Sequence, residues 1–159
     1  MKKLAHLCLL TLLLTAGVSV SAVAGRDNRP RRDIIGLRLD MTREDAHSRL
    51  QKIGTLQREE RKRQEVWEVR DPYFSHVIVG FDKQSRVRFV TAVAREGGER
   101  MRYADVASLE KARQEGDVSA NNYNYVWELA ARGREPKGLV MARGRDPLYL
   151  STYSIKKLD

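Results

Sequence analysis

The residues best suited to chemistry form a run of aromatic side chains late in the chain. Tyr123, Tyr125 and Trp127 alternate with polar or aliphatic residues, and this alternation places the three rings on one face of a strand. If this face is covered, the three rings belong to the hydrophobic core. We favour that interpretation because one face of a small sheet must pack against the elements that cover it. An exposed face would be a binding platform of the kind found at interaction hot spots.

Basic residues follow this aromatic run. Arg132, Arg143 and Arg145 lie in predicted turns and at the end of a short predicted strand. If the aromatic face is exposed, Tyr123 and Tyr125 together with these arginines form a candidate binding site. Its partner would be a protein or an anionic envelope component, such as a lipid headgroup or lipopolysaccharide. A basic surface that only aids solubility is the alternative.

Signals for catalysis or metal binding are weak. His47 and His76 lack a second His or Cys at ligand spacing, and we expect His47 to face solvent. No Gly-x-Ser-x-Gly turn occurs, and acids such as Glu59 and Glu60 are more typical of a solvated face than of a glycosidase pair. We therefore predict no catalytic residue, no metal site and no cofactor. A hydrolase acting on envelope polymers remains an alternative.

The N-terminus has the pattern of a cleavable signal peptide over residues 1–24. Two lysines precede a mostly apolar stretch, and small residues lead to a predicted cleavage site between Ala24 and Gly25. The strongly apolar part, residues 7–14, is too short to span a hydrocarbon layer of ~30 Å. We expect a periplasmic or secreted protein that is soluble after cleavage and keeps no transmembrane segment.

The only cysteine, Cys8, lies inside this apolar stretch rather than just after it. A lipoprotein needs its acylated cysteine after the apolar stretch, so we expect neither a lipid anchor nor a disulfide. The whole chain carries 30 basic and 21 acidic residues. That excess favours anionic partners, although nucleic acid is not expected for an exported protein.

Beyond the leader, residues 25–33 form a polar, basic lead-in that we predict to be flexible. Residues 34–159 have the length of one domain. A helix is predicted over residues 43–53, because Thr42 is a good N-cap and the apolar residues recur at helical spacing. Period-two alternation then predicts an antiparallel meander with strands over residues 55–61, 65–70, 76–81 and 86–95.

A second round of the same order follows. Val106, Leu109 and Ala112 recur at helical spacing, which predicts a helix over residues 103–115. Strands are predicted over residues 123–129 and 138–143, and residues 148–155 are predicted to form a final strand or an extended tail. The predicted fold is therefore α+β, with short helices packed on an antiparallel meander sheet.

The two rounds share short sequence echoes. Residues 66–69 (VWEV) match 126–129 (VWEL), and 70–72 and 145–147 are both RDP. The offsets differ, so this is no strict repeat. The echoes indicate either chance or a degenerate duplication of a helix-plus-meander unit, with halves at residues 34–95 and 99–159.

Residues 35–46 (IGLRLDMTREDA), followed by Leu50 and by Trp67 in the next predicted strand, resemble the opening of the SmpA/OmlA (BamE-like) family. The β-lactamase-inhibitor-like domains are similar in the same unit. The resemblance covers about residues 34–95 and implies a compact envelope or secreted domain that binds proteins. It also suggests, as a further alternative, an inhibitor of a secreted enzyme.

The combined prediction is an exported, non-enzymatic binding or scaffold module of the bacterial cell envelope. It would present one sheet face and a basic rim to its partner.

Overall fold

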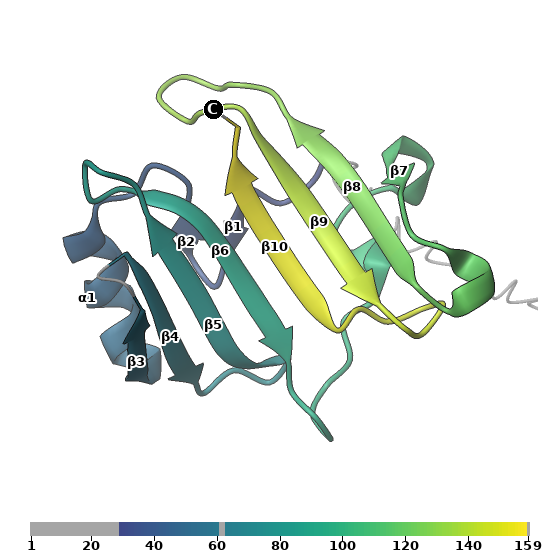
Figure 1. Ribbon diagram of the computed structural model, residues 1–159, viewed down its shortest axis with the longest axis horizontal. Helices are drawn as coiled ribbons and strands as arrows, with labels where there is room; N and C mark the ends of the chain where they lie inside the picture. Colours follow the sequence, from purple (N-terminus) through teal and green to yellow (C-terminus); the bar gives the residue numbers. More distant parts are fainter. Residues whose placement is uncertain (1–28, 61–62, 159) are drawn as a thin grey trace, which may run out of the picture.

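The computed structural model describes residues 29–60 and 63–158, so the predicted signal peptide lies outside the described residues. Figure 1 shows a large sheet with the α-helix of residues 43–53 behind one of its ends. The elements in chain order are β1 Asp33–Ile34, β2 Leu37–Arg38, α1 Arg43–Ile53, β3 Gly54–Glu60, β4 Gln64–Val69, β5 Phe74–Phe81, β6 Val87–Ala94, the 3-10 helices η1 Tyr103–Asp105 and η2 Leu109–Lys111, β7 Arg113–Gln114, the 3-10 helix η3 Val118–Ala120, β8 Tyr123–Leu129, β9 Gly138–Gly144 and β10 Thr152–Lys157.

The main sheet has eight antiparallel strands in the order β3-β4-β5-β6-β10-β9-β8-β7. It consists of two four-stranded meanders, β3 to β6 and β7 to β10, whose last strands pair with each other. In that seam Ile155 lies opposite Val90 and Tyr153 lies opposite Ala92. Strands β1 and β2 form a separate small hairpin.

The predicted first helix is confirmed as α1. The Thr42 hydroxyl accepts a hydrogen bond from the Asp45 amide at 3.2 Å, and two acids in the first turn complement the helix dipole. Ala46 and Leu50, one helical turn apart, are both fully buried against the sheet.

The predicted α+β fold, with short helices packed on a meander, is wrong. The described chain contains one α-helix and is mostly β-strand. The predicted strands are present in both halves, but residues 103–115 form two single 3-10 turns and a short strand instead of a helix.

Tertiary contacts explain this difference. In an α-helix the carbonyl of Ser108 would accept a bond from the amide four residues later, but here it accepts the indole N–H of Trp127 at 2.9 Å. Residues 113 and 114 then pair with β8. Packing against the sheet therefore overrides a weak local helical pattern.

Of the two explanations of the sequence echoes, a duplicated helix-plus-meander unit does not fit, because residues 99–158 contain no α-helix. The sequence echo nevertheless occupies equivalent strands. Strands β4 and β8 are each second from an edge of the sheet. Their tryptophans, Trp67 and Trp127, are both buried on the same face.

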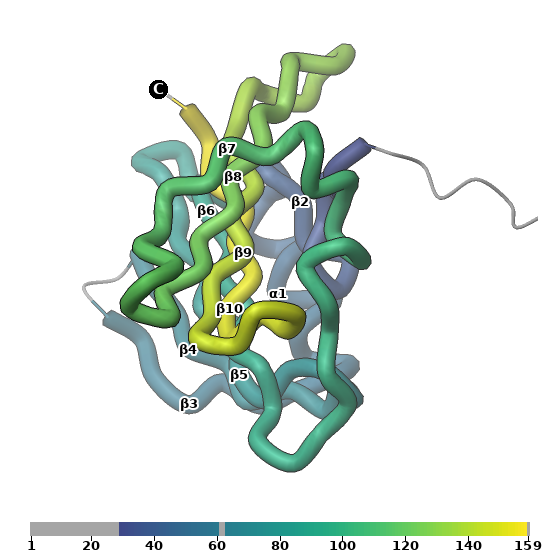
Figure 2. The backbone as a smooth tube through the Cα atoms, turned by 90° about the vertical axis from the view of Figure 1, so that its right-hand side faces the viewer, coloured from purple at the N-terminus to yellow at the C-terminus, as the bar shows by residue number. Residues whose placement is uncertain are grey.

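The covering elements all lie against one face of the sheet, which we call the covered face. Helix α1 contacts β3 and β4, and β1 contacts β6 and β10. In the second half, Tyr103 from η1 packs on Tyr125 from β8, with ring centroids 4.8 Å apart. Figure 2, turned by 90°, shows α1 and β2 on one side of the central strands. The hydrophobic core fills this side.

Candidate binding face

The opposite face of the sheet, which we call the open face, carries a continuous row of side chains across all eight strands. Directly paired residues lie on the same side of a sheet. Each member of the row neighbours, along its strand, a residue whose side chain enters the core or borders it. From β3 to β7 this central row reads Arg58, Val66, Ile78, Thr91, Ser154, Met141, Val126 and Arg113.

The open face is apolar near its middle. Phe89, Val93 and Leu139 flank the central row, and like Val66, Ile78 and Met141 they are half-buried and do not join the core cluster. Val126 is only 3 % exposed yet is also outside that cluster. The six half-buried side chains keep part of their surface exposed and form an apolar patch on this face, whereas Val126 is buried beside them.

The central row has an approximately symmetric chemistry about the seam between the two meanders. Thr91 and Ser154 face each other across β6 and β10 with their hydroxyl oxygens 2.9 Å apart. Two apolar residues follow on each side, and an arginine ends the row at each edge. Each terminal arginine pairs with a nearby acid, Arg58 with Glu60 at 2.8 Å and Arg113 with Glu115 at 2.7 Å.

Charges of both signs border the patch. They are Arg58, Glu60, Glu68, Arg113, Glu128, Arg143 and Lys156. An apolar centre with a polar, mixed-charge rim has the anatomy of a protein–protein interface. A surface for anionic polymers would instead carry charge of one sign.

The predicted aromatic platform lies on the covered face. Trp127 is 2 % exposed, and Tyr123 and Tyr125 are half-buried against the core. Tyr103 packs against both tyrosines, and its burial raises the pKa of its hydroxyl to about 12. The structure therefore places these aromatic side chains in the packing position that the sequence analysis favoured.

The three predicted arginines do not gather around these tyrosines. Arg143 lies at the end of β9 on the open face, where its Nε donates to Asn124 Oδ1 at 3.1 Å. Arg132 lies between β8 and β9 and Arg145 between β9 and β10, and both are exposed. A binding role for these five residues stays a prediction.

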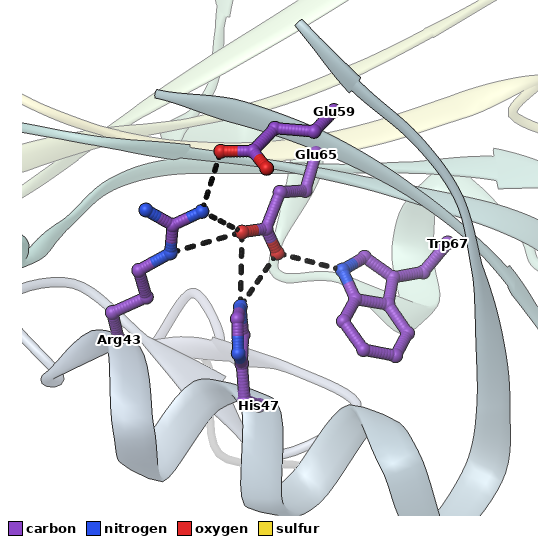
Figure 3. Close-up of polar contacts among 5 residues, drawn as sticks. All are labelled: Arg43, His47, Glu59, Glu65 and Trp67. Carbon is purple, nitrogen blue, oxygen red and sulfur yellow. Dashed lines mark hydrogen bonds and ion pairs between the residues drawn. The ribbon is translucent and has the colours of Figure 1, made fainter. Parts of the chain in front are cut away.

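The described residues also contain one buried polar cluster, shown in Figure 3. Glu65 on β4 is fully buried and is the only charged residue in the described core. Its carboxylate accepts bonds from Arg43 Nε at 3.0 Å and Trp67 Nε1 at 2.9 Å. His47 Nε2 lies 2.8 Å from Glu65 Oε2. His47, which was predicted to face solvent, keeps 31 % of its side chain exposed but directs Nε2 to this buried carboxylate.

Two opposing effects act on this carboxylate. Burial alone would raise the pKa of Glu65, but the hydrogen bonds from Trp67, His47 and Arg43 together outweigh it and lower that pKa. Glu59 also pairs with Arg43, at 2.8 Å, and raises the pKa of that guanidinium. With both oxygens occupied, Glu65 stays ionised and ties α1 to the sheet. It offers no free atom to a substrate.

Sequence reasoning did not identify the open face. Strand β6 carries apolar residues on both sides, with Phe89, Thr91 and Val93 alternating against Val90 and Ala92. Alternation therefore shows two faces without showing which one is covered. One feature of the sequence does distinguish the two faces of β6. Phe89, Thr91 and Val93 include a hydroxyl and a large ring, whereas the smaller Val90 and Ala92 suit a tightly packed core.

Among residues 29–60 and 63–158, no group of three His, Cys, Asp or Glu side chains is arranged to hold a metal ion. In the same part of the chain no helix has the length and apolar character needed to cross a membrane. Neither a protein-family model nor a curated protein nor a solved structure matches this chain.

Proposed function

We propose that this protein is an exported, non-enzymatic binding module that presents the open face of its sheet to a protein partner. The observation that carries the proposal is the uncovered apolar patch on the central row with its mixed-charge rim. A periplasmic or secreted location is part of the proposal and rests on the signal-peptide pattern of residues 1–24.

Binding is favoured over catalysis by the state of the most unusual ionisable group. Glu65 is sealed beneath α1, and its oxygens are held by three side chains. A catalytic acid or base must reach a substrate atom, and this carboxylate reaches only its own partners. Its arrangement supports a rigid scaffold behind the binding face.

The test uses quantitative affinity capture from a cell-envelope fraction, followed by direct binding measurements on the recovered partner. The variant carries Ile78→Glu and Met141→Glu. These substitutions place one charge on each side of the seam between β6 and β10. Because desolvating a charge at an interface centre is unfavourable, we expect at least a tenfold loss of affinity.

The control is Leu148→Glu, which makes the same chemical change at an apolar residue that is 60 % exposed in a loop. This variant should keep wild-type affinity, and thermal melts should show that all three proteins fold. A partner that binds the double variant as tightly as the wild type would rule out the open face as its docking surface.

A further inference from the structure

A second surface feature lies away from the open face. A hollow of about 1130 Å³ is lined by residues 29–32, Tyr73, Met101, residues 104–110 and Arg132. The 101–110 segment packs on the covered face through Tyr103, so the hollow lies on that side of the sheet. In Figure 2 the chain near β1 runs close to the segment that carries η1 and η2.

One wall of the hollow is held in place by specific bonds. The Tyr153 hydroxyl donates to the carbonyl of Arg31 at 3.4 Å. Arg32 donates through Nη1 to Glu135 at 3.1 Å and through Nη2 to the carbonyl of Ala130. Arg32 is therefore used as an anchor for this stretch, and its charge is balanced by Glu135.

Two other guanidinium groups at the hollow keep their charge unbalanced. Arg31 and Arg132 are exposed, and among the described residues neither forms an ion pair with a carboxylate. The backbone of Arg132 is fixed by a pair of bonds with Glu135, at 3.1 and 3.0 Å. Both exposed guanidinium groups line the hollow and can donate to an anion, for which the planar guanidinium is suited.

The other wall has a different chemistry. Glu110, which is exposed, lines it together with the apolar side chains of Met101 and Val106. The Glu110 carboxylate would repel a bare polyanion but accept hydrogen bonds from hydroxyl groups. A ligand that satisfies both walls therefore carries an anionic group at one end and several hydroxyls at the other.

We infer that this hollow binds a phosphorylated sugar, with the phosphate on Arg31 and Arg132 and sugar hydroxyls on the wall that bears Glu110. The same chemistry occurs in a free sugar phosphate and in the phosphorylated sugar headgroup of a glycolipid. The inference does not depend on the open face having a protein partner, because the two surfaces share no residue.

The experiment is calorimetric titration of the purified protein at low salt with glucose 6-phosphate, inorganic phosphate and glucose. Lipopolysaccharide micelles form a fourth arm. We expect saturable binding of glucose 6-phosphate that is tighter than that of either fragment. Binding of the micelles alone would also support the site and would identify the lipid-linked source.

The variant Arg31→Gln with Arg132→Gln should lose at least tenfold in affinity. The matched control, Arg134→Gln with Arg145→Gln, removes the same charge from exposed positions outside the hollow and should stay within twofold of wild type. Equal losses in the two pairs would show that general basic charge is responsible, and would overturn the inference.

Glu110→Gln tests the second wall. It should weaken glucose 6-phosphate severalfold while leaving inorganic phosphate binding the same or tighter. If inorganic phosphate binds the wild type as tightly as the sugar phosphate, or if no probe binds saturably, the proposed ligand class is wrong. Circular dichroism melts of each variant confirm that the fold is intact.

Discussion

The two halves of the sheet place a tryptophan at equivalent positions but satisfy its indole N–H in different ways. Trp67 on β4 donates to the buried carboxylate of Glu65. Trp127 on β8 donates to the backbone carbonyl of Ser108. The first bond belongs to an ionic cluster that holds α1, and the second belongs to a neutral contact with an irregular segment.

This difference shows that one strand pattern is compatible with two kinds of cover. A charged cluster is stable only while every partner is present, since a buried charge that loses its partner is costly. Neutral aromatic packing, as between Tyr103 and Tyr125, tolerates the loss of one polar bond better. The halves should therefore respond unequally to matched substitutions.

Glu65→Ala should give the largest loss of stability. It removes the carboxylate to which Arg43, His47 and Trp67 all bond, and breaking such a buried pair costs about 3–5 kcal/mol. Urea denaturation followed by circular dichroism measures the change. Glu59→Ala is the control, because the Glu59 side chain is 42 % exposed and should contribute only about 0–1 kcal/mol. Equal losses would mean that the cluster does not act through burial.

The tryptophan pair tests the comparison directly. Trp67→Phe removes a bond to a charged acceptor and should cost about 2 kcal/mol, whereas Trp127→Phe removes a bond to a neutral carbonyl and should cost about 1 kcal/mol. Ser108 O still accepts from the Lys111 amide at 3.3 Å in the second variant. Parallel urea titrations of both variants give the two values. A larger cost at Trp127 would contradict the proposed difference between the halves.

The loss of folding stability in acid should come from the half of the sheet that contains β3 to β6. In the folded protein the hydrogen bonds to Glu65 hold its pKa below the ordinary glutamate value of 4.5. Its stabilisation is therefore complete above about pH 4.5 and is lost as the pH falls through the native pKa. Each unit of pKa separation contributes about 1.4 kcal/mol.

This acid dependence is measured by urea denaturation between pH 7 and pH 3. Glu65→Gln should be less stable than wild type at pH 7, and its stability should fall less steeply below pH 4.5. Two curves that run parallel through this range would show that another group causes the acid loss.

The sequence predicts much of the first half but little of how the second half is covered. Helix α1 can be predicted from Thr42 and from the apolar stripe with Ala46 and Leu50, because capping and helical spacing are local signals. The segment around Ser108 has similar spacing, yet its conformation is set by a bond to Trp127, 19 residues further along the chain. No local pattern contains that contact.

The candidate site was harder to predict than the strands. Alternation correctly groups Phe89 with Thr91 and Val93, but which side of β6 receives a cover depends on where β1 and β2 pack. The same limit applies to Glu65. Its strand position was visible in the sequence, whereas its burial follows from Arg43 and His47 reaching down from the helix.

The smallest effect is expected at the seam that joins the two halves. Thr91→Val removes the hydroxyl that lies 2.9 Å from Ser154 Oγ. Both side chains are half-exposed, so water can replace the bond and the loss of stability should stay below about 1 kcal/mol. Val90→Thr, the adjacent and fully buried residue on the covered face, is the matched control and should cost about 1–3 kcal/mol. If Thr91→Val proves the more destabilising in urea titrations, the halves are joined through the open face rather than through the core. That face would then be a structural seam and a poor candidate for binding.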